Sequence, residues 1–214
     1  MEGDELAIRQ RLKTDFPHYA EKCLRIRTKT KGLKPFVLNK AQHYINERME
    51  AQLAETGMIR CLILKGRQQG ISTYVAARYY HRASMFPRKN VFILSHEMQS
   101  TEGLFDMVAR YHKHNPFAPS VGTSNAKELK FDQIDSMYRV ATAGHKAAGR
   151  SRTMSLFHGS EAALWENPKE HFAASVQTVP KRPGTEVILE STAKGASGLF
   201  FQKWQEAERG DGEY

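Results

Sequence analysis

The most informative part of this chain for its fold is the stretch Cys61-Leu62-Ile63-Leu64-Lys65-Gly66-Arg67-Gln68-Gln69-Gly70-Ile71-Ser72-Thr73. An apolar run ends in a basic loop that contains glycine, and a segment rich in alanine and tyrosine follows the loop. This order predicts a strand, a loop and a helix. Backbone N–H groups of such a loop, together with the N-terminus of the helix, favour an anion such as phosphate.

The loop departs from the usual phosphate-binding motif, G-x-x-x-x-G-K-[ST]. With Gly70 as the second glycine, Lys65 stands in place of the first glycine and Ile71 in place of the lysine. Ser72 keeps the position of the hydroxyl that binds magnesium. Hydrolysis of a nucleotide still requires a cation beside its β- and γ-phosphates, and Lys65 and Arg67 are the candidates within the loop.

The composition is that of a soluble globular protein with a basic surface. The chain has 214 residues, of which 40% are hydrophobic, and a formal net charge of +9. A positive excess of this size suits a polyanionic partner such as nucleic acid, and a solvated basic surface is the alternative. Two cysteines provide no disulfide framework, and the sequence shows neither a signal peptide nor an apolar run of membrane-spanning length. We therefore expect a cytosolic protein that is not embedded in a membrane.

Hydrophobic periodicity predicts helices that alternate with strands. An N-terminal helical segment is expected from Glu5 to about Arg27, with a break at Pro17, and a basic connector is expected over 25–34. Asn39 is the expected N-cap of the next helix. Buried strands are predicted at 90–96, 154–161 and 186–192, a hairpin at 128–143, and helices at 72–84, 100–112, 169–177 and 198–209. This alternation predicts a doubly wound α/β fold with a parallel sheet and right-handed crossovers.

Two further strand ends carry residues suited to nucleotide chemistry, because ligands of parallel sheets bind at the carboxyl ends of the strands. Glu161 follows an apolar strand and Ser160, where a carboxylate can polarise the attacking water or hold a metal through water. A capping serine followed by a glutamate is the alternative. Ser191 and Thr192 precede the glycine turn at Gly195 and are placed to sense a γ-phosphate, with a plain turn as the alternative.

Four histidines show no pattern of metal ligands: His96, His112, His114 and His158. They lack the H-E-x-x-H or Cys/His spacing of zinc sites. We expect no zinc, and we expect His96 and His158, at strand ends, either to pack in the core or to support neighbouring site residues.

Taken in order, these segments resemble the ATPase domain of the large terminase subunit of tailed bacteriophages. The resemblance runs from about Pro35 to the C-terminus and rests on the Gln42 region, the loop 65–72, and the segments 91–96, 156–165 and 190–195. It implies a P-loop NTPase of the additional-strand, catalytic-glutamate (ASCE) type, with a mainly parallel central sheet flanked by helices. Residues 1–34 would form an N-terminal helical lead with a basic linker, and residues 35–214 the ATPase domain. The nuclease domain that such subunits also carry is expected to be absent from this chain.

The resemblance assigns roles to individual residues. Gln42 matches the glutamine that recognises adenine, Glu161 matches the catalytic glutamate, and the motif at Ser191 matches the one that couples hydrolysis to movement. The nucleotide-binding set is then Gln42, Lys65, Gly66, Arg67, Gln68, Gln69, Gly70, Ile71, Ser72, Thr73, Ser191 and Thr192. Magnesium would be held by Ser72 and Glu161, partly through water.

Two features depart from the family pattern or leave a choice open. Ser160 stands where the family has the Walker B aspartate, so the magnesium shell must depend more on Ser72 and water. The catalytic set is Glu161, Lys65, Arg67 and Arg150. Either Arg67 acts within its own subunit, or Arg150, with Arg152 nearby, acts on a neighbouring subunit as an arginine finger. Phosphate contact with DNA is the alternative for Arg150 and Arg152.

The resemblance implies an ATPase that uses ATP and Mg²⁺ to drive double-stranded DNA into a preformed capsid. Its partners would be DNA, the portal protein and the small terminase subunit, and it would work as a homo-oligomeric ring in the host cytoplasm without entering the finished particle. Two rivals remain at this point: a helicase-like DNA-remodelling ATPase, and a DNA-binding or docking module that hydrolyses ATP weakly or not at all.

Overall fold

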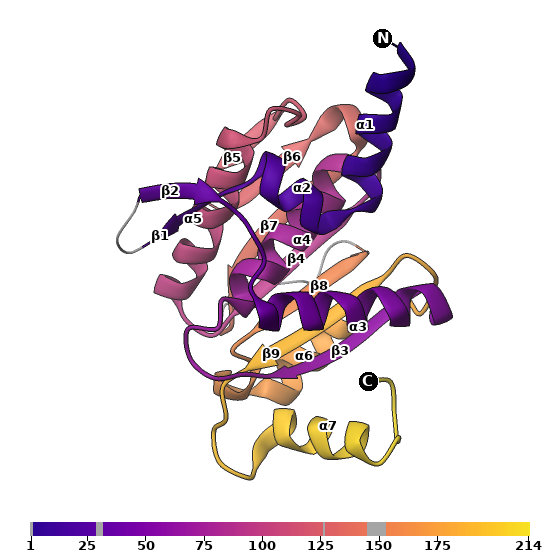
Figure 1. Cartoon of the computed structure of the whole chain (residues 1–214). Coiled ribbons are helices and arrows are strands. Elements are labelled where there is room, and N and C mark those ends of the chain that lie inside the picture. The colour runs from indigo at the N-terminus through magenta and orange to yellow at the C-terminus, as the bar shows by residue number, and fades with distance from the viewer. Residues whose placement is uncertain (1, 29–31, 126, 145–152) are drawn as a thin grey trace.

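A mainly parallel sheet forms the centre of the protein in the computed structural model, which describes residues 2–28, 32–125, 127–144 and 153–214 (Figure 1). The strand order of this sheet is β3-β9-β8-β4-β7-β6-β5. Neighbours from β3 to β7 run parallel, and β6 and β5 extend the sheet in antiparallel pairs. The strands are β3 Ile59–Leu64, β4 Asn90–Ser95, β5 Thr123–Asn125, β6 Glu128–Phe131, β7 Ser136–Thr142, β8 Leu156–Ser160 and β9 Glu186–Ser191. The predicted fold class is confirmed, as is the antiparallel hairpin at 128–143.

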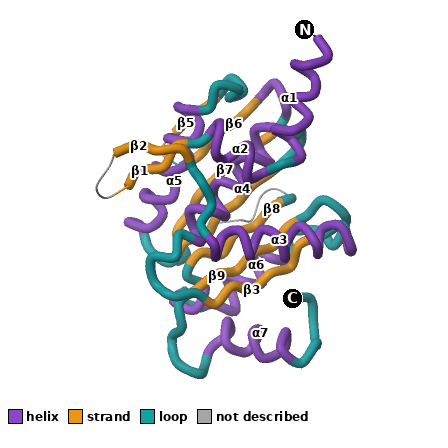
Figure 2. The backbone as a smooth tube through the Cα atoms, viewed as in Figure 1, coloured by secondary structure: helices purple, strands orange, loops and turns teal. Residues whose placement is uncertain are grey.

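Helices cover both faces of this sheet (Figure 2). They are α1 Glu2–Thr14, α2 Phe16–Cys23, α3 Lys40–Thr56, α4 Ile71–Met85, α5 Met98–His114, α6 Pro168–Val176 and α7 Gly198–Glu208, with short 3-10 helices at Asp132–Ile134 and Ala162–Leu164. In the part of the chain that the structure describes, no helix combines the length and apolarity needed to cross a membrane.

Two hydrophobic cores lie on the two faces of the sheet. Along β4, Val91 and Ile93 belong to the first core, while Phe92 and Leu94 belong to the second. This division follows from the strand repeat, in which successive side chains point to opposite faces. Residues of α1 to α5 join the first core, and residues of α6 and α7 join the second. Both faces are therefore buried, which explains why β4, β8 and β9 read as continuous apolar runs.

The N-terminal lead is part of the first core. Leu12 of α1 and Phe16 and Tyr19 of α2 are buried in it beside side chains of α4. Pro17 lies in the first turn of α2, where its missing N–H costs no helical hydrogen bond. The predicted division into two helices is thus confirmed, but the break lies at Asp15, the N-cap of α2, and α2 ends at Cys23 and not near Arg27.

The prediction of a plain basic connector over 25–34 was wrong. Strands β1 (Arg25–Thr28) and β2 (Gly32–Pro35) pair antiparallel there, with Arg25 opposite Pro35. Ile26 packs partly against the first core between two arginines. This alternation of apolar and charged residues is the pattern of a half-buried strand, and the density of positive charge concealed it.

Candidate functional site

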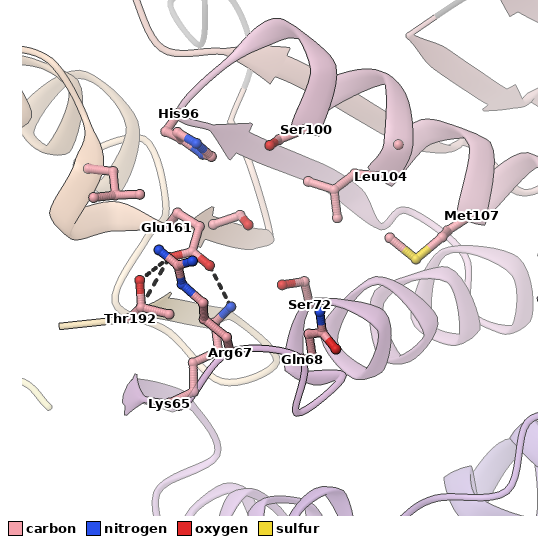
Figure 3. A pocket seen from close by; sticks show the side chains of 13 residues that line it. Lys65, Arg67, Gln68, Ser72, His96, Ser100, Leu104, Met107, Glu161 and Thr192 are labelled. Carbon is pink, nitrogen blue, oxygen red and sulfur yellow. Dashed lines mark hydrogen bonds and ion pairs between the residues drawn. The ribbon is translucent and has the colours of Figure 1, made fainter. Parts of the chain in front are cut away.

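Three strand ends meet at one edge of the sheet, around a cavity of ≈ 490 Å³. Strand β9 lies between β3 and β8, and Glu190 is in register with Ile63 on one side and Ser160 on the other. Because the three strands are parallel, the residues that follow them emerge together. The lining includes Lys65, Arg67, Gln68, Ser72, Ser160, Glu161 and Thr192 from these strand ends and the loop, and His96, Ser100, Leu104 and Met107 from the β4–α5 region (Figure 3).

The loop after β3 turns into α4 at a glycine in the left-handed conformation. Gly70 has φ 71° and is the N-cap of α4, which begins at Ile71. A side chain at position 70 would be strained, and its Cβ would lie 2.8 Å from Nε2 of Gln42. Ile71 is buried in the first core, so the residue that replaces the usual lysine serves packing. The next residue, Ser72, faces the cavity.

Lys65 joins two carboxylates at this edge. Its Nζ lies 2.6 Å from Oε1 of Glu161 and 3.0 Å from Oε2 of Glu190, and its side chain is only 10% exposed. Burial by itself would lower the pKa of Lys65, but the two carboxylates outweigh it and the pKa is raised. Lys65 therefore carries a positive charge at the front of the loop, as the shifted-lysine interpretation requires.

Glu161 follows β8 in a left-handed conformation, with φ 50°. Its Oε2 accepts hydrogen bonds from the backbone N of Thr192 at 3.0 Å, from Thr192 Oγ1 at 3.1 Å and from Ser191 Oγ at 3.4 Å. Burial would raise the pKa of Glu161, but the hydrogen bonds from Lys65 and Thr192 outweigh it and the pKa is lowered. The structure thus brings together the predicted catalytic glutamate and the predicted coupling residues. A non-glycine residue at positive φ is a form of backbone strain that is concentrated at functional sites.

Glu190 is a residue of this site for which the sequence predicted no role. It is 0% exposed, and its Oε1 accepts hydrogen bonds from Ser72 Oγ at 2.7 Å and Ser160 Oγ at 2.8 Å. His158 Nε2 lies 3.4 Å from the same oxygen. Burial would raise the pKa of Glu190, but His158, Lys65 and Ser72 lower it to about 2. The available signal was a single carboxylate at the end of the apolar run 187–189.

Gln42 holds the loop from the N-terminus of α3. Asn39 and Gln42 form the capping box of that helix, so the predicted N-cap is confirmed. The Gln42 side chain is buried, and its Nε2 donates to the carbonyl of Gly70 at 2.7 Å. Asn39 Nδ2 donates to the carbonyl of Gln69 at 3.1 Å. Both contacts fix the loop, and recognition of adenine by Gln42 stays a prediction.

The remaining predicted residues divide between the cavity and other surroundings. Arg67 and Gln68 line the cavity, and Arg67 is exposed. Thr73 donates from Oγ1 to Met107 Sδ at 3.5 Å and is absent from the lining, as are Gly66 and Gln69. Arg150 and Arg152 lie outside the described residues.

The oxygen atoms at this edge fit a small hard cation. Ser72 supplies a hydroxyl, and Glu161 and Glu190 supply carboxylates. Among the described residues, the buried Oε2 of Glu190 has only the ammonium of Lys65 as a partner. Oxygen donors of this kind suit Mg²⁺, which usually keeps several waters and takes phosphate oxygens as ligands. Over residues 2–28, 32–125, 127–144 and 153–214, no group of three or more His, Cys, Asp or Glu side chains could hold a metal alone. A cation here would accordingly depend on a phosphate ligand.

No protein-family model matches the sequence, and no curated protein matches it significantly. Among solved structures, the large terminase of bacteriophage HK97 aligns with a TM-score of 0.73 at 12% identity, over 93% of this chain and 42% of that chain. The large terminase ATPase domain of Thermus phage P74-26 aligns with a TM-score of 0.53 at 21% identity, over 68% of this chain and 62% of that chain. The SWI2/SNF2 ATPase core of Sulfolobus solfataricus, solved with double-stranded DNA, aligns with a TM-score of 0.51 at 13% identity, over 90% of this chain and 42% of that chain.

These alignments confirm the resemblance at the level of the fold. The chain spans less than half of the HK97 large terminase and less than two thirds of the P74-26 ATPase domain chain. The fold that it adopts is the one shared by phage large terminases and SWI2/SNF2 ATPase cores.

Proposed function

We propose that this chain is the ATP-hydrolysing motor domain of a viral DNA-packaging terminase. The observation that carries the proposal is the hydrogen-bonded group of Lys65, Glu161 and Thr192 beside the N-terminus of α4. A loop cation, a strand-end carboxylate and a polar sensor are the parts that phosphoryl transfer to water requires. They lie around one cavity with a hydroxyl, Ser72, suited to a metal.

In the proposed reaction, the triphosphate enters beside α4 and Lys65 transfers from the carboxylates to the phosphate oxygens. Glu161, which loses its ion pair, then orients the attacking water and accepts its proton. Bound Mg²⁺ would neutralise charge on the β- and γ-phosphates, and Ser72 and Glu161 would hold it, partly through water. Nucleotide binding would thus activate Glu161 as a base, because the Lys65 ammonium pairs with Glu161 before binding and with the phosphate after it.

Ser191 and Thr192 connect this chemistry to movement. Both donate to Oε2 of Glu161, whereas Lys65 donates to Oε1, so a change in Glu161 alters the hydrogen bonds at the end of β9. That strand leads through residues 193–197 to α7. We propose that this connection transmits hydrolysis to DNA movement.

The wider assembly follows from the same proposal. Double-stranded DNA suits the net charge of +9. A portal protein and a small terminase subunit would be partners, and the domain would act in a homo-oligomeric ring in the host cytoplasm without remaining in the finished particle. Arg67 in the same subunit, or Arg150 from a neighbour, would stabilise charge in the transition state.

Replacement of Glu161 tests the proposed reaction. We expect Glu161→Gln to lower magnesium-dependent ATP turnover by about 10² to 10⁴ while ATP binding is retained, because the amide occupies the same space but cannot accept the proton. Phosphate release and binding of a fluorescent ATP analogue measure the two effects. Glu102→Gln, at an exposed position of α5, is the control. Unchanged turnover in Glu161→Gln would remove Glu161 from this role.

A DNA-remodelling ATPase is the second candidate, favoured by the likeness to the SWI2/SNF2 core. A packaging motor should move DNA only when assembled on a portal, whereas a remodeller should displace a bound protein or strand without one. A chain that shows no magnesium-dependent ATPase activity, even at high concentration with DNA, would instead favour the docking module.

A further inference from the structure

A buried carboxylate lies beside Ser72, although position 160, where the family pattern has an aspartate, holds a serine. In this chain, position 160 at the end of β8 holds a serine, which is uncharged. The hydroxyl of Ser72 nevertheless donates to a carboxylate, that of Glu190, at 2.7 Å. Glu190 belongs to β9, the next strand of the sheet, and is directly in register with Ser160.

The geometry explains how a residue on the adjacent strand reaches this place. Neighbouring strands are about 4.8 Å apart, and glutamate has one methylene more than aspartate. The shorter Ser160 lies beside the glutamate and donates to its Oε1 at 2.8 Å. Oε1 thus receives two hydroxyl hydrogen bonds, and both orient the carboxylate toward the loop.

Packing does not account for a charge at this position. Glu190 is 0% exposed, and it follows the apolar residues 187–189 on a strand that is buried on both faces. Burial of an ionised carboxylate is costly unless partners compensate for it, and an apolar residue would serve the core as well or better. Its second oxygen, Oε2, has no hydroxyl or amide donor among the described residues and is paired with the ammonium of Lys65 at 3.0 Å. Oε2 of Glu190 would therefore lose its partner when the Lys65 ammonium moves to the phosphates, as proposed above.

We infer that Glu190 supplies the carboxylate of the magnesium shell, as a ligand of the ion or of its bound water, in place of an aspartate at position 160. Ser72 is the hydroxyl partner, and Ser160 is a positioning residue that acts through Glu190. Glu161 is then left to activate water. This inference rests on the proposed function, since the ion arrives with the nucleotide.

Nucleotide affinity with and without magnesium tests the inference. A fluorescent non-hydrolysable ATP analogue is titrated into the whole chain in MgCl₂ and in EDTA, and Mn²⁺ binding in the presence of the analogue is followed by electron paramagnetic resonance. We expect Glu190→Gln to lose about tenfold or more of the affinity gained from magnesium, with weaker Mn²⁺ binding. Its affinity in EDTA should be unchanged or higher. Glu97→Gln, which removes a carboxylate beside the lining residue His96 but touches neither Ser72 nor Lys65, should keep the full gain.

A double variant returns the charge to the neighbouring strand. Ser160→Asp combined with Glu190→Gln should recover the magnesium-dependent gain, which a merely structural role for Glu190 would not predict. If Glu190→Gln alone fails to fold, the double variant decides by the same measurement: a folded double variant without the gain overturns the inference.

Other outcomes separate the inference from the proposed function. If the unmodified chain gains affinity from magnesium and Glu190→Gln keeps all of that gain, the inference is wrong and the proposed function stands. An equal loss of affinity in MgCl₂ and EDTA would also overturn the inference, because it would show only a disturbed loop. If the unmodified chain binds no nucleotide, the proposed function fails and the inference fails with it.

Discussion

Lys65 is the residue on which the proposed phosphate site depends. Ile71 stands at the position of the usual lysine and is buried in the first core. The ammonium of Lys65 nevertheless lies at the cavity, between Glu161 and Glu190. Its raised pKa keeps it protonated at neutral pH, because both carboxylates favour the charged form. A phosphate that enters the cavity competes with these carboxylates for one cation.

Substitution of Lys65 should affect nucleotide binding or turnover, whereas substitution of Ile71 should affect stability. We expect Lys65→Ala to weaken ATP binding or turnover by about tenfold or more, through loss of a charge-assisted contact. Ile71→Ala should instead lower the free energy of unfolding by about 2 to 5 kcal/mol, because it leaves a cavity in the core. Nucleotide titration and urea denaturation measure the two quantities. The reverse ranking would contradict the shifted-lysine interpretation.

Lys65, Glu161 and Thr192 could be predicted from the sequence because each stands where an apolar strand ends. The role of Glu190 could not. Periodicity identifies which residues belong to a strand, but it does not say which strands are neighbours. Only the order β3-β9-β8 places Glu190 between the loop and Ser160.

Among the elements, α4 joins the loop at 65–70 to the N-terminal lead. It begins at the loop and carries the buried His81 near its end. Nε2 of His81 lies 2.8 Å from the carbonyl oxygen of Leu12 in α1. Tyr19 of α2 and Ser84 of α4 share a hydrogen bond of 3.1 Å. The lead thus contributes to the packing of the helix that positions Ser72.

His81 should make the stability of this packing sensitive to mild acid. Burial, with help from the Arg82 and Arg78 charges, lowers the pKa of His81 to about 3 from an ordinary value of 6.5. Between these values the unfolded chain binds a proton that the folded chain does not, so stability falls as the pH falls below 6.5. We expect a loss of about 1 to 2 kcal/mol between about pH 7 and about pH 5, measured by urea denaturation.

The variant His81→Gln serves as the comparison for this pH effect. It should be less stable at neutral pH but should lose less stability on acidification, since the titrating group has been removed. Equal losses in the two proteins would assign the pH dependence to other groups.

The elements themselves were largely predictable, and the exception is informative. Continuous apolar runs and helical spacing locate most of the sheet and its helices, because both faces of the sheet are buried. The hairpin of β1 and β2 was missed, because its alternation is short and its charges dominate the composition.

For the whole molecule, the proposed ring makes a prediction about subunits. A single subunit cannot hold DNA while it resets, so packaging should require several copies. If Arg150 acts on a neighbour, mixing an Arg150→Ala chain with a Glu161→Gln chain should restore part of the ATPase activity, because some interfaces pair an intact arginine with an intact glutamate. The activity of the mixture is compared with that of each variant alone. No recovery would favour Arg67 acting in its own subunit, or neither arginine.

Local patterns of apolar, glycine and charged residues were enough to predict the α/β class, a loop with Lys65 at its front and a carboxylate at the end of β8. Which of these side chains come into contact depends on the tertiary structure. Register across parallel strands placed Glu190 next to Ser160, and the start of α4 brought Ser72 within 2.7 Å of its carboxylate. These two contacts join residues that are 30 and 118 positions apart, and no local pattern encodes them. The physical reason is that strand order fixes neighbours, and strand order is a property of the whole packed sheet.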